Sequence, residues 1–135
     1  MPWDCNDHEY RNVLGLDARG RYEYFIHKVA DWQEVWGLRR QAGWVTFGHP
    51  DGGEGFPFWP HPRYAEACAT GDWSDHLPES IPLDAFVERW LPGMAADGLK
   101  VAVFPVPETN NAAVLAPETL KADLEEELLK YEGEV

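Results

Sequence analysis

The chain has 135 residues, of which 44% are hydrophobic and seven are Trp, enough apolar material for one core and too much for a disordered chain. Its 11 Lys and Arg against 24 Asp and Glu give a net charge of -13, which repels nucleic-acid phosphates and anionic lipids. We therefore expect neither nucleic acid nor a membrane as partner. A basic protein surface fits the charge, although solubility alone would also account for it, and the oligomeric state is left open.

The N-terminal sequence predicts a cytoplasmic protein. No apolar run approaches the ~18 residues of a membrane span, and the first residues lack the basic and apolar regions of a signal peptide. Thiols stay reduced in the cytoplasm, so we expect no disulfide between Cys5 and Cys68. Residues 1–15 are expected to form a partly mobile N-terminal extension.

The first regular element is predicted as a helix over residues 17–30. Tyr22, Phe25, Ile26 and Val29 follow the i, i+3, i+4, i+7 spacing of a buried helix face, and Asp17 is a suitable N-cap.

Three short β-favouring segments follow this helix. Residues 34–38 and 43–47 suggest an antiparallel hairpin, and the turn residues 50–53 lead into a third strand over 55–59 that Pro60 ends.

Two helices and a loop are predicted in the middle of the chain. A short helix over 64–69 follows Pro62, and residues 72–80 read as a loop whose Trp73 packs back onto the core. The second helix, which Pro92 breaks or restarts, has the clearest apolar stripe: Leu83, Phe86, Val87, Trp90 and Leu91.

The C-terminal third predicts a hairpin and a helix. Strands over 100–104 and 112–115 are joined by a loop with Asn110 and Asn111. Pro117 opens the last helix, whose predicted buried stripe is Leu120, Leu124, Leu128 and Tyr131. This order favours a single α+β domain over residues 16–135, with a mostly antiparallel sheet of about five short strands packed by N-terminal, central and C-terminal helices.

No catalytic, cofactor or metal site is predicted. Cys5, Asp7 and His8 supply too few ligands for a tetrahedral ion, and Cys68 lies on a small apolar helix face where cysteine fills core space. The histidines of the predicted loops are expected to be solvated or locally hydrogen-bonded; they are His49, His61 and His76.

The C-terminal helix carries more acid than helix stability explains. Segment 117–135 has seven acidic residues and two lysines, a net of 2 − 7 = −5. Two interpretations of this acidic helix are open: a solvated helix face, or a face that binds a partner protein. The candidate partner-binding residues are Trp73, Asp123, Glu125, Glu126, Glu127 and Tyr131.

Aromatic and proline landmarks follow one another in a fixed order along the chain: Arg21–Phe25, Glu34–Leu38, Phe58–His61 with Tyr64 and Ala65, Ile81–Phe86 with Trp90–Pro92, and Val103–Pro107. This set resembles the bacterial family known as domain of unknown function 2750, from about residue 16 to 132. The resemblance implies a small cytoplasmic α+β protein and brings no reaction or catalytic residues with it.

Two functions remain open from the sequence. The first is a non-enzymatic protein-interaction module, such as an immunity-type inhibitor that covers a basic surface on a bacterial toxin. The alternative is a small enzyme or ligand-binding protein that uses the loops around His49 and His61.

Overall fold

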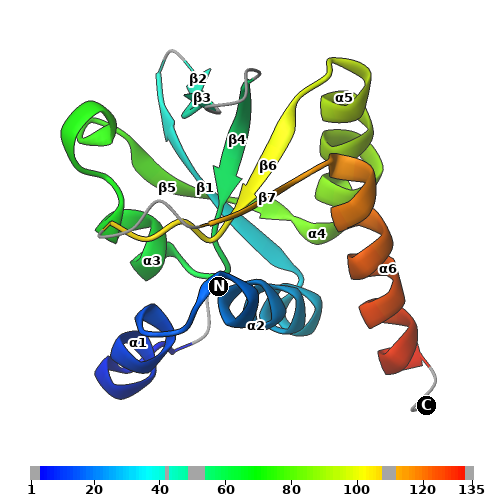
Figure 1. Ribbon diagram of the computed structural model, residues 1–135, viewed down its shortest axis with the longest axis horizontal. Coiled ribbons are helices and arrows are strands. Elements are labelled where there is room, and N and C mark those ends of the chain that lie inside the picture. The colour runs from blue at the N-terminus through cyan, green and yellow to red at the C-terminus, as the bar shows by residue number, and fades with distance from the viewer. Residues whose placement is uncertain (1–3, 42, 49–53, 108–111, 133–135) are drawn as a thin grey trace.

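Two β-sheets form the centre of the molecule, and helices pack at one end and along one side of them (Figure 1). The computed structural model describes residues 4–41, 43–48, 54–107 and 112–132, without the side chains of residues 72, 131 and 132. Helices and strands share one hydrophobic core, so the predicted α+β class is confirmed.

The first sheet has the strand order β2-β1-β5. Strand β1 (Glu34–Arg40) pairs antiparallel with β2 (Gly43–Trp44) and with β5 (Leu77–Pro82). The prediction of a loop over 72–80 was wrong, because residues 71–73 form the short 3-10 helix η1 (Gly71–Trp73) and β5 follows. Its two prolines are tolerated because β5 is an edge strand whose outer N–H groups need no partner.

The second sheet has the order β3-β4-β6-β7. Strand β3 (Phe47–Gly48) pairs antiparallel with β4 (Glu54–Phe58), and β6 (Lys100–Val103) pairs antiparallel with β7 (Ala113–Leu115). Between these pairs, β4 and β6 run parallel. The described sheets are thus mostly antiparallel, as predicted, but they are two in number and include one parallel pair. The described part has seven strands, where about five were expected, and the predicted strand over 43–47 is divided between β2 and β3 of different sheets.

Close approach of β4 to β6 requires a glycine. A Cβ atom at Gly55 would lie 1.9 Å from the backbone oxygen of Lys100. The two sheets also meet: Trp36 and Trp59 exchange two backbone hydrogen bonds, of 2.9 and 2.8 Å. This bridge brings the indole ring of Trp59 into the core, where it is fully buried.

Helix α2 (Ala18–Trp32) confirms the first predicted helix and its cap. The Asp17 side chain accepts a 2.8 Å hydrogen bond from the Gly20 N–H, and Phe25 and Val29 are fully buried.

The central helices run from residue 83 to 96 without a gap. They are α4 (Leu83–Ala85), the π-helical turn η2 (Phe86–Trp90) and α5 (Leu91–Ala96). The Leu91 N–H reaches back to the Phe86 carbonyl, a wider turn that relieves the clash a proline ring at 92 makes with the preceding helical turn. Pro92 therefore restarts the helix and does not end it.

Helix α6 (Pro117–Glu132) closes the fold along α5 and α2 (Figure 1). Leu120 and Leu124 are fully buried, as predicted, and Leu128 packs partly buried at the edge of the core. The predicted role of Tyr131 in this stripe falls on a side chain outside the described part.

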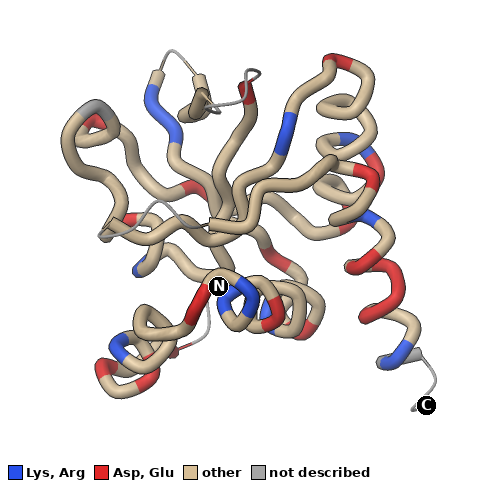
Figure 2. The backbone as a smooth tube through the Cα atoms, in the orientation of Figure 1, with Lys and Arg blue, Asp and Glu red and all other residues tan. Residues whose placement is uncertain are grey.

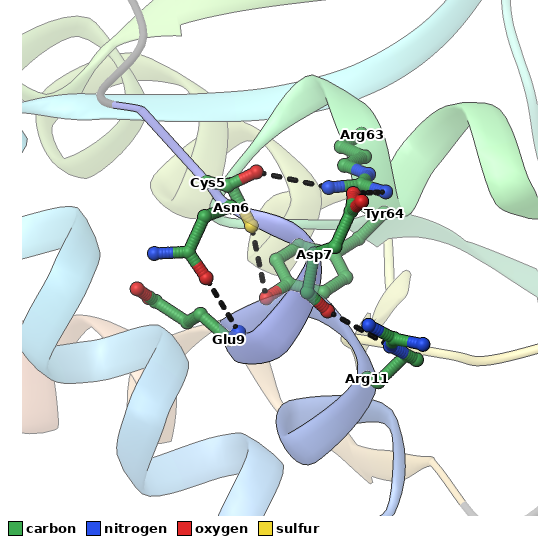
Figure 3. A network of polar contacts seen from close by, with 7 residues as sticks. All are labelled: Cys5, Asn6, Asp7, Glu9, Arg11, Arg63 and Tyr64. Carbon is green, nitrogen blue, oxygen red and sulfur yellow. Dashed lines mark hydrogen bonds and ion pairs between the residues drawn. The ribbon is translucent and has the colours of Figure 1, made fainter.

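The N-terminal extension contains helix α1 (Asp7–Leu14), which packs beside α3 (Pro62–Ala67). Cys5 and Val13 belong to the buried core, and Arg63 of α3 donates to the Cys5 carbonyl at 3.0 Å and to the Asp7 carboxylate at 2.6 Å (Figure 3). Partial mobility of residues 1–15 stays a prediction.

Candidate protein-interaction groove

A hollow of about 370 Å³ lies between α2 and α6 on the surface of the protein. Its lining combines two side chains with apolar bodies and five charged ones, and Figure 2 shows the run of acidic residues along α6. We call this hollow the acidic groove; its lining residues are Tyr22, Glu23, Ile26, Asp123, Glu126, Glu127 and Lys130.

Helical spacing places these side chains together. Tyr22 and Ile26 are four residues apart on α2, so they lie on one face. Asp123, Glu126, Glu127 and Lys130 follow the i, i+3, i+4, i+7 spacing on α6, so they share the face turned toward α2.

A hydrogen bond from the Tyr22 hydroxyl to the Asp123 carboxylate joins the two helices. Burial, and then this bond, raise the pKa of Tyr22, so the hydroxyl keeps its proton and remains the donor. Asp123 is therefore held in a fixed orientation at the base of the groove.

The carboxylates that line the groove differ in how many positively charged side chains lie beside them. Glu127 is 3.6 Å from the His27 ring and 3.2 Å from Lys130, and Glu23 is 3.3 Å from Arg19. Glu126 has no ion-pair partner among the described residues. Four carboxylates and one ammonium line the groove, so the net formal charge of its lining is 1 − 4 = −3.

The groove contains three of the residues that the sequence predicted for partner binding, Asp123, Glu126 and Glu127. Glu125 points elsewhere: it pairs with Lys121 at 3.4 Å and does not line the groove. Trp73 lies on another face, half-buried, with its ring 6.3 Å from that of Trp59. The binding roles of Glu125, Trp73 and Tyr131 stay predictions.

Sequence reasoning missed the half of the groove that α2 supplies. Tyr22 and Ile26 were taken as part of the core stripe, and Ile26 is indeed 8% exposed. The signal that could have found them is the polar hydroxyl of Tyr22, since a tyrosine on a core stripe usually directs its hydroxyl to a partner at the edge.

The loop histidines are buried and not solvated. His61 and His76 lie outside helices and strands, as expected, but at 8% and 7% exposure. For His61 the expected alternative, a local hydrogen bond, is confirmed. His61 is the N-cap of α3, and its Nδ1 accepts from the Arg63 N–H at 3.1 Å. His49 lies outside the described residues.

Cys68 is a buried core residue, as predicted. Its thiol lies 3.2 Å from the Pro105 carbonyl, and burial raises its pKa to about 11. A thiol of this kind is a poor nucleophile, since the reactive form is the thiolate. Cys5 and Cys68 are both free.

Within the described part of the chain, no group of three or more His, Cys, Asp and Glu side chains is placed to hold a metal ion. Nor does any helix there combine the length and the apolar character that crossing a membrane requires.

Fold and groove define a small acidic α+β protein with a concave, negatively charged surface. The chain belongs to the family described as protein of unknown function (DUF2750), whose model matches residues 22–124. This confirms the resemblance seen in the sequence, over a slightly shorter span. Comparison with curated proteins and with solved structures found no match.

The family match includes only part of the groove. Tyr22, Ile26 and Asp123 lie inside it, whereas Glu126, Glu127 and Lys130 lie beyond residue 124. The function of the groove is therefore argued from this chain alone.

Proposed function

We propose that this protein is a non-enzymatic interaction module whose acidic groove binds a Lys or Arg side chain on a basic partner protein. The single observation that carries the proposal is the composition of the groove, in which Tyr22 and Ile26 lie beside carboxylates that outnumber the one lining ammonium by three. Long basic side chains have the complementary shape, an apolar stem with a charged head.

The groove would hold such a side chain in two ways. Its methylene stem packs against Tyr22 and Ile26, and its charged head reaches Glu126, whose carboxylate no described cation neutralises. An Arg head would add a second hydrogen bond to Asp123, because the guanidinium donates through several N–H groups.

The net charge of -13 would act before contact is made. A field of this sign draws a basic surface toward the acidic face and raises the association rate. We further propose a cytoplasmic partner of the bacterial toxin type, which makes this protein an immunity-type inhibitor. Its small size and its acidity support that proposal, and the support is by analogy.

Charge reversal on α6 tests the proposal. Glu126→Lys places a cation in the groove, and Glu125→Lys makes the same change of charge on the neighbouring residue outside it. With each variant as bait in the native host, we expect Glu126→Lys to lose the partner that the wild type and Glu125→Lys retain.

The inhibitor proposal needs its own measurement. Co-expression of the captured basic protein in a sensitive host should arrest growth, and the wild type should restore it while Glu126→Lys does not. Equal capture and equal rescue by both variants would show that the groove is not the binding surface.

A further inference from the structure

A second hollow, of about 320 Å³, lies at the far end of β1, on elements other than those of the acidic groove. It is lined by Arg40, residues 43–46, Trp73 and His76. Its volume is at the lower end of the ~300–1,000 Å³ range of small-ligand sites.

His76 is a buried polar group with unused hydrogen-bonding capacity. The residue is 7% exposed, and its Nδ1 makes no hydrogen bond with any described residue although Asp75 Oδ1 lies 3.0 Å away. Nδ1 faces this carboxylate, so Nε2 is the ring nitrogen that is left for a ligand. The Asp75 carboxylate favours the ring proton on Nδ1, which leaves the lone pair on Nε2 to accept a hydrogen bond.

Arg40 supplies the complementary donors. Its Nη1 donates to Asp75 Oδ2 at 2.9 Å, and a guanidinium has further N–H groups for a ligand. The same bond holds the pKa of Asp75 below its usual range, so the pair is charged and its two charges cancel. In a chain of net charge -13, such a locally neutral site disfavours an anionic ligand.

The aromatic lining indicates the shape of the ligand. Trp44 and Trp73 are half-buried, and each indole also contacts a second indole. The ring centroid of Trp44 lies 4.9 Å from that of Trp90, and that of Trp73 lies 6.3 Å from that of Trp59. Indoles held in place by neighbours favour a flat aromatic ring, through stacked or edge-to-face contact.

We propose that this hollow binds a small, neutral heteroaromatic ring with adjacent hydrogen-bond donor and acceptor groups, of the nucleobase type. Arg40 donates to the acceptor of the ring, His76 Nε2 accepts from its donor, and the indoles of Trp44 and Trp73 hold its faces or edges. The phosphates of a nucleotide are disfavoured by the charge of the protein, so the free base or nucleoside is the form that binds.

Titration of the full chain with 9-methyladenine tests the proposal, with the indole N–H signals of Trp44 and Trp73 followed by NMR. We expect saturable shifts of both signals. 9-Methylpurine lacks the exocyclic amino donor and should bind about tenfold more weakly, the loss that one good hydrogen bond makes. Adenosine 5′-monophosphate should bind more weakly than adenosine.

An ion-paired surface arginine away from the hollow provides the matched control. Arg40→Gln should weaken 9-methyladenine binding about tenfold, whereas Arg19→Gln should leave it within about twofold, because Arg19 pairs with Glu23 at 3.3 Å on α2 and does not line the hollow. His76→Asn, if it folds, should match Arg40→Gln. The proposal is overturned if 9-methyladenine produces no shift at saturation, if both arginine variants weaken binding equally, or if the monophosphate binds more tightly than the nucleoside.

Discussion

The guanidinium of Arg63 in α3 lies 2.6 Å from the carboxylate of Asp7 at the start of α1 (Figure 3). The same guanidinium lies 4.0 Å from the centre of the Tyr10 ring, and α1 is also connected to α2 by a hydrogen bond between Tyr24 and Glu9. These contacts fasten the N-terminal helix to the domain, although the family match begins only at residue 22.

Asp7→Asn should destabilise the attachment of α1 in a pH-dependent way. The hydrogen bond from Arg63 holds the pKa of Asp7 below its usual 3.8. A carboxylate whose pKa is lower in the folded state than in the unfolded state stabilises the folded protein fully at a pH above its unfolded-state pKa. This stabilisation is lost as the pH falls through the folded-state pKa. We expect faster amide hydrogen exchange in α1 of the variant at neutral pH, with a difference that shrinks below about pH 4.

The control for this experiment is Asp97→Asn, at an exposed carboxylate beyond the end of α5. It should leave exchange in α1 unchanged at every pH. A difference between wild type and Asp7→Asn that persists undiminished at low pH would contradict the ion-pair explanation.

The two cysteines report on the opening of the N-terminal helix. Burial raises the pKa of both thiols, that of Cys68 to about 11, so neither is reactive in the folded protein at pH 8. If residues 1–15 are partly mobile, Cys5 in the Cys68→Ser variant should react with a disulfide reagent faster than Cys68 in the Cys5→Ser variant. Both should react at least about a hundredfold faster in urea. Equal native rates would mean that α1 opens only when the whole domain unfolds.

Trp90→Ala should destabilise the protein by about 3 kcal/mol, the low end for a truncated core tryptophan, because the side chain is only partly buried. Its ring contacts Trp44, Phe56 and Phe58 at centroid distances of 4.9, 6.1 and 5.9 Å, and the loss leaves a cavity among them. Trp32→Ala, at a side chain that is 44% exposed, is the control and should cost less than about 1 kcal/mol. Urea unfolding measures both, and similar values for the two would contradict the assigned role of Trp90.

Local patterns were sufficient to predict most of the helices and strands, but not α1, which lies in the segment expected to be a partly mobile extension. The stripe of α2 and the cap at Asp17 are properties of neighbouring residues, so they can be read without the fold. Strand β5 could not, because Pro78 and Pro82 argue against a strand until its edge position is known. The parallel pairing of β4 with β6 joins segments about forty residues apart, which no local signal encodes.

The groove was predictable only on its α6 side. An excess of acid in residues 123–127 is visible in the sequence, but which carboxylates face α2 depends on how two helices pack. Burial of His61 and His76 likewise depends on long-range packing, which the residues around each histidine do not encode. His61→Ala should cost about 1 kcal/mol through the lost cap of α3.

Charge on α6 should affect binding of the basic partner in two separable ways. Glu125 and Glu126 contribute equally to the field around the protein, but only Glu126 lines the groove. Neutralising either, as Glu125→Gln or Glu126→Gln, should slow association to a similar extent. Only Glu126→Gln should also speed dissociation, because it removes a contact made in the complex.

Stopped-flow or surface binding with the captured partner measures both rates. Replacing Asp123, Glu125, Glu126 and Glu127 together by Asn and Gln should slow association several-fold. Thermal stability should be nearly unchanged, because an asparagine at position 123 can still accept from the Tyr22 hydroxyl. The association rate of the wild type should fall with added salt, since the Debye length shrinks from ~10 Å at 0.1 M to ~3 Å at 1 M. An association rate indifferent to salt and to all four substitutions would leave the acidic face as a solubility feature, and the partner would then have to bind through the half-buried aromatic surface around Trp73.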